Sequence, residues 1–380
     1  MPSPTRSISE PSKVLVFGAG NFGSCLADHL GDSDHDVYLW SRQGEVVESL
    51  NKTHRNPMYL KDHHFSTNIT AVGPELPGET LINEMDVLLF AIPTQFLREN
   101  LEKLRLYLNK EKHPLLIFVN KGIEIGTHAL TLEIITDTCG AGIAKAATFI
   151  SGPSFAKESK ICNLTCLLVV QRQPTSVSVT SFTDSEAQRA AILFHQPHFR
   201  CYTGSDPIGT ELAGALKNVY AIAAGAADGL GFENNTRAMI ITRGLAEMTR
   251  IGTAYGADPL TFLGLAGVGD LFMSCSSPTS RNYSVGFRLG KGESLDSIIN
   301  NLGSVAEGVT TAKGVKMILD ELGIKARIAT TVIYEETIIP GKDIQAAVRE
   351  LLELPSSKEI DLPSATGGPA KQLMKKLGLD

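Results

Sequence analysis

The pattern of hydrophobic and polar positions changes near the middle of the chain. In the first half, short hydrophobic runs alternate with segments of helical spacing, which is typical of an α/β domain. Helices are expected at Ser24–Leu30, from Pro93 onward and at Asp184–Phe194. The runs predict strands at Val14–Phe17, Asp36–Trp40, Asp86–Ile92, Pro114–Val119, Ala147–Ser151 and Leu164–Val170, with an edge strand at Phe199–Tyr202.

The stretch Pro207–Gly229 predicts one long helix, because proline favours the start of a helix and glycine its end. Its core-facing apolar stripe comprises Leu212, Ala215, Leu216, Val219, Ile222 and Ala223. Lys217 lies off that stripe, among mostly small residues that would let a ligand come close to the backbone. The alternative is an ordinary lysine that keeps its ammonium group in water.

After residue 205 the sequence shows almost no strand signal. Further helices are expected at Arg237–Tyr255, Leu271–Ser274, Ala312–Leu322 and Asp343–Leu352. The chain is therefore divided into an α/β domain at 13–204 and an all-α domain at 205–354. Residues 1–12 and 355–380 are expected to be loosely ordered tails.

Length and composition fit this division and exclude several other classes of protein. The chain has 380 residues, of which 43% are hydrophobic and 20% charged, as in ordinary globular proteins of two domains. The net charge of −6 gives no support for nucleic-acid binding. Six scattered cysteines predict a reduced, intracellular chain with neither disulfides nor a metal site. No apolar run reaches the length of a membrane-spanning segment, and the N-terminus lacks the features of a signal peptide.

A glycine fingerprint follows the first predicted strand. Gly18 allows a tight turn, Gly20 lets a pyrophosphate approach the backbone, and Gly23 lets helix and strand pack closely. The N–H groups at the start of the next helix can bind the anion. This strand–turn–helix context predicts a Rossmann-type dinucleotide site, whereas the alternative is a glycine-rich turn that binds nothing.

The end of the second predicted strand bears on the choice between NAD and NADP. NAD sites usually carry a carboxylate there to bind the ribose, but this chain reads Trp40-Ser41-Arg42, with no carboxylate before Glu45. Arg42 could contact a 2′-phosphate or stack on adenine, or it could be a solvated arginine. We therefore expect either NAD or NADP as the cofactor.

Three charged residues are candidates for the chemistry. Lys121 follows the strand Pro114–Val119, where ligands of open α/β sheets bind, although it could be a solvated loop lysine. Asp270 ends a glycine-rich loop and could simply cap the next helix. Arg281 lies in the first turn of a helix, where a guanidinium and free N–H groups suit a phosphate.

Two histidines in the first half are also candidates for acid–base chemistry. His195 and His198 lie beside the predicted edge strand, with no nearby partner in the sequence. Both are therefore interpreted as structural.

The chain resembles the NAD(P)-dependent glycerol-3-phosphate dehydrogenases of the bacterial type. The resemblance covers roughly residues 13–350 and includes motifs in the family's order. These are GAGNFG (18–23), NPMYL (56–60), IPTQFLR (92–98), NKGIE (120–124), SGPSFA (151–156), ELAGALKNVYAIAAGAADGL (211–230), GLAGVGDL (264–271), SRN (280–282) and AEGV (306–309).

The resemblance implies reversible reduction of dihydroxyacetone phosphate to sn-glycerol 3-phosphate by a cytoplasmic homodimer, with Lys217, Lys121 and Asp270 as catalytic residues. The implied substrate-binding residues are Lys121, Gly152, Ser154, Lys217, Asn218, Asp270, Ser274, Ser280, Arg281 and Asn282. The implied cofactor-binding residues are Gly18, Gly20, Asn21, Phe22, Gly23, Arg42, Tyr59, Phe96, Lys121, Ala156, Arg281, Val305 and Glu307.

The implied chemistry agrees with the residue types. The ammonium group of Lys217 could donate a proton and stabilise an oxyanion. A neighbouring Lys121 would lower its pKa, and Asp270 would hold it in place and partly offset that shift. Two alternatives remain: a 3-hydroxy-acid or 6-phosphogluconate type of dehydrogenase, and a non-catalytic nicotinamide sensor.

Overall fold

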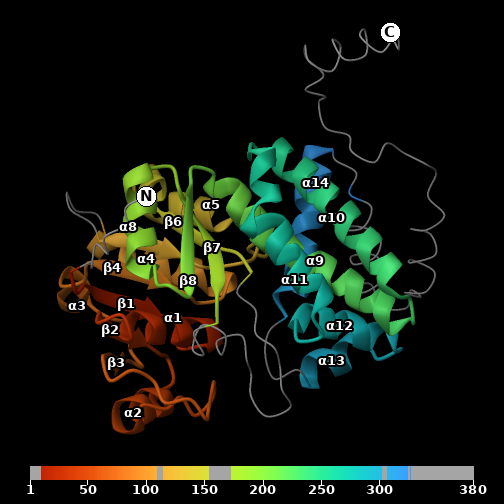
Figure 1. The fold of residues 1–380 in the computed structure, drawn as a ribbon. Helices are drawn as coiled ribbons and strands as arrows, with labels where there is room; N and C mark the ends of the chain where they lie inside the picture. Colours follow the sequence, from red (N-terminus) through yellow and green to blue (C-terminus); the bar gives the residue numbers. More distant parts are fainter. Residues whose placement is uncertain (1–9, 109–113, 154–172, 302–305, 324–325, 327–380) are drawn as a thin grey trace, which may run out of the picture.

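A computed structural model describes residues 10–108, 114–153, 173–301, 306–323 and 326. Within these residues the chain forms an α/β half followed by a helical half (Figure 1). The expected order of an α/β Rossmann-type domain and an all-α domain is confirmed. No helix of the described residues is long and apolar enough to cross a membrane.

The α/β half is built on one sheet of eight strands. Their spatial order is β3-β2-β1-β4-β5-β6-β7-β8, and every pair is parallel except β6 with β7. The order reverses between β1 and β4, and ligands of such sheets bind beyond the carboxyl ends of the strands at this point. The strands are β1 Lys13–Phe17, β2 Asp36–Trp40, β3 Ile69–Val72, β4 Val87–Phe90, β5 Leu115–Phe118, β6 Thr148–Ser151, β7 Thr175–Ser181 and β8 Phe199–Gly204.

Helices cover both faces of this sheet, so its central strands are apolar on both sides. In β1, Val14 and Val16 pack with the layer of α1 (Asn21–Gly31) and α8 (Asp184–Phe194). Leu15 and Phe17 face the opposite layer. That layer contains α3 (Glu79–Asn83), α4 (Leu97–Leu108), α5 (Thr131–Cys139) and α6 (Ala141–Ala146), while α2 (Gly44–Thr53) lies against β3.

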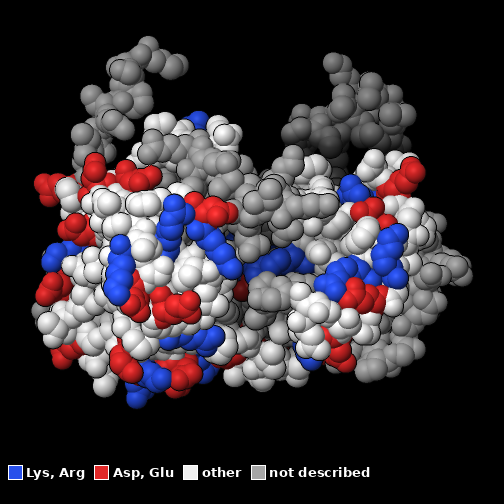
Figure 2. Space-filling model, turned by 90° about the horizontal axis from the view of Figure 1, so that it is seen from below, with Lys and Arg blue, Asp and Glu red and all other residues white. Residues whose placement is uncertain are grey.

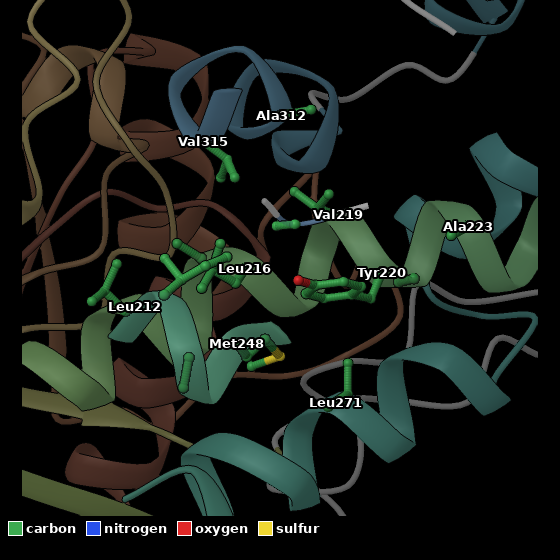
Figure 3. Packing of buried hydrophobic residues seen from close by; sticks show 14 of the residues in the cluster. Leu212, Leu216, Val219, Tyr220, Ala223, Met248, Leu271, Ala312 and Val315 are labelled. Atoms are coloured by element: carbon green, nitrogen blue, oxygen red, sulfur yellow. The ribbon is translucent and has the colours of Figure 1, made fainter. Parts of the chain in front are cut away.

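The helical half is arranged around α9 (Pro207–Gly229), which begins at the expected proline and ends at the expected glycine. The six residues of the expected stripe all belong to the core. The other faces of the helix are covered as well, because every residue except Ile208 and Asp228 is buried. Its apolar side chains pack against several surrounding helices (Figure 3). The other helices are α10 Asn234–Ala254, α11 Asp270–Ser276, α12 Arg281–Gly290, α13 Leu295–Asn301 and α14 Glu307–Leu322.

Glycines bring α9 and α12 into backbone contact. A Cβ atom added at Gly225 would lie 2.0 Å from the carbonyl oxygen of Tyr283, and one added at Gly286 would lie 1.9 Å from that of Ile222. Neither position can accept a larger residue without separating the two helices. This packing fixes the start of α12, which carries Arg281, relative to α9, which carries Lys217.

Several elements were not predicted. The sequence analysis missed two strands, β3 and β7, and the helices α2, α3, α5, α6 and α13. The stretch 264–269, expected as a loop, forms a wide helical turn in which Gly269 donates to the carbonyl of Gly264 over 3.2 Å. The expected strand Leu164–Val170, the expected helix Asp343–Leu352 and the tail 355–380 lie outside the described residues.

Candidate active site

A cleft of about 980 Å³ lies between the two halves of the molecule. It extends from the carboxyl edge of β1 and β4 to α9 and α12, so residues far apart in the sequence share its walls. Viewed from below, Lys and Arg side chains lie along the hollow between the two lobes (Figure 2). The basic residues that line the cleft are Arg42, Lys103, Lys121, Lys217 and Arg281.

The glycine fingerprint forms one end of the cleft and leaves room for a dinucleotide. Gly18 has φ +112°, and a Cβ there would lie 2.9 Å from the carbonyl oxygen of Ala91. A Cβ at Gly23 would lie 1.9 Å from the carbonyl oxygen of Gly18, so helix and strand pack too closely for a side chain. A Cβ at Gly20 would meet nothing within 4 Å, because this position faces the open cleft. The residues present therefore fit a pyrophosphate at the start of α1.

Arg42 forms the outer wall of the same cleft together with Phe96. Its guanidinium carbon lies 5.5 Å from the centre of the Phe96 ring, a cation–π arrangement. Both groups line the cleft beyond the fingerprint. Their planar faces and the positive charge suit an adenine ring and a neighbouring phosphate.

Three charged side chains meet at the inner end of the cleft. Asp270 is fully buried at the start of α11, and its two oxygens accept from different lysines. Lys217 Nζ lies 2.6 Å from Oδ1, and Lys121 Nζ lies 2.8 Å from Oδ2. Lys217 also donates to Ser274 Oγ over 3.0 Å, and Lys121 to the carbonyl of Gly152 over 3.3 Å. The carboxylate thus joins the α/β half to the helical half.

The expectation that Asp270 could cap the helix is wrong. The cap position is occupied by Gly269, and Asp270 is the first residue of α11. Its carboxylate turns inward instead, where two ammonium groups compensate for the cost of burying a charge.

Burial lowers the pKa of Lys217 to about 8. Desolvation is the largest cause, Asp270 opposes it, and the charge of Lys121 lowers the pKa further. Lys217 is only 2% exposed, so it is not the solvated lysine of the alternative interpretation. A lysine with this pKa can both release and accept a proton near neutral pH.

The start of α12 forms the wall beside Lys217. Arg281 and Asn282 line the cleft, and the amide oxygen of Asn282 accepts from the backbone of Gly308 over 2.9 Å. Ser280 is fully buried, and its hydroxyl caps α12 by accepting from the Tyr283 N–H over 3.3 Å. Ser280 therefore shapes this wall without lining the cleft.

Glu307 begins α14 and lines the same part of the cleft. Burial raises the pKa of its carboxyl group, while Arg281, Lys121 and Lys217 act in the opposite direction. Because three cations surround it, Glu307 partly balances the positive charge of the cleft.

The remaining expected site residues fall into three groups. Asn21, Phe22, Tyr59 and Asn218 line the cleft, as the resemblance implies. Gly152 and Ser274 lie behind it, where they accept from the two lysines. Ser154, Ala156 and Val305 lie outside the described residues.

The cleft also contains residues that the sequence analysis did not single out. Asn120, Thr279 and Lys103 line it. Asn120 is the first residue of the NKGIE motif, and Thr279 directly precedes the SRN motif, so a motif was the available signal for both. Of the two histidines, His195 is not among the lining residues, and the ring of His198 packs against His29.

Comparison with known proteins decides the family. A glycerol-3-phosphate dehydrogenase [NAD(P)+] from Limosilactobacillus reuteri is 39% identical over 342 residues, which cover 90% of this chain and 97% of the relative. The chain belongs to the NAD(P)-dependent glycerol-3-phosphate dehydrogenases. The family's N-terminal model, described as NAD-dependent glycerol-3-phosphate dehydrogenase N-terminus, matches residues 13–180, and the corresponding C-terminus model matches residues 206–349.

Other glycerol-3-phosphate dehydrogenases agree with this assignment. The enzyme of Staphylococcus aureus is 37% identical over 92% of this chain and 100% of its own length. The crystal structure of the Coxiella burnetii enzyme covers 90% of this chain and 99% of that chain, with 28% identity and a TM-score of 0.79. The protein is therefore an NAD(P)+-dependent oxidoreductase with glycerol-3-phosphate dehydrogenase activity, which favours this function over the two alternatives left by the sequence.

Proposed function

We propose that this dehydrogenase reduces dihydroxyacetone phosphate to sn-glycerol 3-phosphate with Lys217 as the proton donor. The observation that carries this proposal is the buried Lys217 ammonium, held between Asp270 and Ser274 at the inner end of the dinucleotide cleft. The nicotinamide cofactor, when bound, supplies the hydride. The cytoplasmic location and the homodimeric state implied by the family stay predictions.

Separate residues would hold the two ends of the cofactor. Gly18, Gly20, Asn21 and Phe22 lie where the pyrophosphate fits against the start of α1. Arg42 and Phe96 lie further out, where they suit the adenosine end. The inner end of the cleft is then left for the nicotinamide and the substrate, next to Lys217.

Lys217 can serve the carbonyl oxygen of the substrate in both directions of the reaction. As negative charge develops on that oxygen, the Lys217 ammonium stabilises it and then transfers one proton to it. In the reverse direction the neutral amine accepts the hydroxyl proton. Asp270 keeps Nζ in place through the contact of 2.6 Å, and Ser274 accepts a second of its protons.

The substrate phosphate is assigned to the start of α12. Arg281 lines the cleft at the first position of this helix, where its guanidinium and the positive end of the helix dipole can meet one anion. Lys121, which belongs to the α/β half and also lines the cleft, adds a second positive charge.

A direct assay tests the proposed reaction. Purified protein should consume NADH and NADPH in the presence of dihydroxyacetone phosphate, and chiral analysis of the product should find sn-glycerol 3-phosphate. Absence of turnover with both cofactors, or formation of the other enantiomer, would contradict the proposal.

Arg42→Asp is expected to weaken NADPH more than NADH. The change places a carboxylate where a guanidinium faces the cleft beside Phe96, so a 2′-phosphate would be repelled. Loss of one charge-assisted contact corresponds to roughly 10- to 100-fold in NADPH affinity. The ratio of the two dissociation constants, measured by fluorescence titration, checks this prediction, and equal losses for both cofactors would show that Arg42 does not sense the phosphate.

A further inference from the structure

The loop that carries Lys121 leaves β5 and has no regular secondary structure between residues 119 and 130. Its lysine must nevertheless reach across the cleft to Asp270 in the other half of the molecule, over a contact of 2.8 Å. A long side chain on an unsupported loop would lose considerable conformational entropy in this contact. Something in the α/β half must therefore hold the backbone of this loop.

The side-chain amide of Gln95 forms two hydrogen bonds with the backbone of this loop. Its nitrogen donates to the carbonyl of Ile123 over 2.8 Å, and its oxygen accepts from the N–H of Ile125 over 2.9 Å. One amide thus pairs with the backbone on both sides of Glu124, as a neighbouring strand would. Gln95 belongs to the short helical turn Thr94–Phe96, directly after the end of β4.

Arg98 holds the side chain of Glu124 from the first turn of α4. Its Nε lies 2.9 Å and 3.0 Å from the two carboxylate oxygens, and its Nη2 lies 2.8 Å from Oε2. Glu124 is buried, at 7% exposure, so its carboxylate depends on this guanidinium. Nη2 also donates to the Asp137 carboxylate of α5 over 3.1 Å, and this contact fixes the orientation of the Arg98 guanidinium.

The same loop is fixed at two further points. The side chain of Asn120 donates to the carbonyl of Ile92, next to the end of β4. Ile123 is buried against α14, where a Cβ added at Gly314 would lie 2.5 Å from its Cγ2 atom. Lys121 lies between these points, so its backbone has little freedom.

We propose that Gln95 and Arg98 are positioning residues that hold Lys121 against Asp270 through the loop 120–125. The inference rests on the proposed function, because it gives Lys121 a part in the reaction. It also accounts for the IPTQFLR and NKGIE motifs, since the structure joins the first to the second through four side chains: Gln95, Arg98, Asn120 and Glu124.

The decisive experiment is a double-mutant cycle between Arg98→Met and Lys121→Met. If Arg98 acts through Lys121, Arg98→Met lowers kcat about tenfold in the native background and causes no further loss in the Lys121→Met background. Gln95→Met should behave in the same way, and it removes no charge, so it tests the inference where Arg98→Met fails to fold. Additive losses in both cycles would overturn the proposal.

A pH profile supplies a readout that a purely structural ion pair would not move. The charge of Lys121 lowers the pKa of Lys217. Displacing Lys121 should therefore raise the pKa of Lys217. In Arg98→Met and Gln95→Met, the alkaline limb of kcat/KM for reduction should shift to higher pH. If the alkaline limb of kcat/KM is unchanged and thermal stability is lower, Gln95 and Arg98 serve the fold alone.

Arg288→Met is the matched control. At the end of α12, the Arg288 guanidinium forms a similar two-point ion pair with the carboxylate of Glu293. The side chain of Arg288 is 28% exposed, and that of Arg98 is 25% exposed. Its removal should leave both kcat and the pH profile unchanged. If Lys121→Met itself keeps the full rate, both the positioning and the assigned part of Lys121 are wrong. If Lys121→Met is impaired and Arg98→Met adds to the loss, only the positioning is wrong.

Discussion

Lys217→Met is expected to lower the rate of dihydroxyacetone phosphate reduction by about 100-fold or more, the usual contribution of a general acid. The variant loses the proton donor and the positive charge next to the developing oxyanion. It should still fold, because Asp270 keeps its contact of 2.8 Å with Lys121 and methionine fills most of the buried space. Steady-state kcat with saturating cofactor is the measurement.

Two controls separate this effect from a general disturbance. Lys316→Met removes a half-buried lysine that pairs with Asp320 on α14, away from the cleft, and it should keep the native rate. Binding of the reduced cofactor to Lys217→Met should stay near the native affinity, because the fingerprint of Gly18, Gly20 and Gly23 is untouched. A folded Lys217→Met variant with near-native turnover would remove Lys217 from the mechanism.

Arg281→Ala is expected to raise the half-saturating concentration of dihydroxyacetone phosphate by roughly 10- to 100-fold, because a hydrogen bond to a charged group contributes about 1.5–3 kcal/mol. The close packing of α12 on α9 holds Arg281 at the wall of the cleft beside Lys217. Unphosphorylated dihydroxyacetone, expected to be a poor substrate, should be almost unaffected. The measurement is the ratio of kcat/KM for the two substrates.

Arg281 also lines the part of the cleft assigned to the cofactor, so cofactor affinity must be measured separately. Arg288→Ala serves as the control, since Arg288 lies at the other end of the same helix and pairs with Glu293. Equal losses for both substrates would assign Arg281 to the cofactor or to the fold, and Lys121 would then be the next candidate for the phosphate.

The local part of the site could be predicted from the sequence. Gly18, Gly20 and Gly23 have a geometric requirement that can be read from their spacing after a hydrophobic run, and the structure shows the close contacts that the spacing implies. The start of α9 at Pro207 and the start of α12 after Ser280 likewise depend on residues within one turn.

The charged centre was harder to predict from the sequence, because the residues that form it lie far apart along the chain. Lys217 lies 53 positions from Asp270, and Lys121 lies 149 positions from it. Local pattern left a helix cap open as the alternative role of Asp270, whereas burial between two lysines decides its orientation. The resemblance to a family brought these residues together, but it gave no account of how the loop of Lys121 is held.

The hydrophobic pattern failed to predict the strands β3 and β7 for a physical reason. β7 reads TSVSVTS, and its only apolar residues are two valines among hydroxyl-bearing residues, so it lacks the continuous apolar run of a central strand. Its backbone pairs with β6 and β8, and this pairing cannot be seen in the sequence. β3 lies at the other end of the sheet, and only two of its four residues are buried.

The pH dependence of kcat/KM in both directions tests most directly whether Lys217 is the proton donor. Burial lowers the pKa of Lys217 to about 8. Reduction requires the ammonium form, so it should be constant below about pH 8 and fall above it, whereas oxidation of glycerol 3-phosphate requires the amine and should rise up to the same pH and then level off. Profiles that break at one common pKa near 8 are predicted, and this break should be missing from the residual activity of Lys217→Met. A native enzyme without a break between about pH 7 and about 9.5, or a break that persists in Lys217→Met, would contradict the assignment.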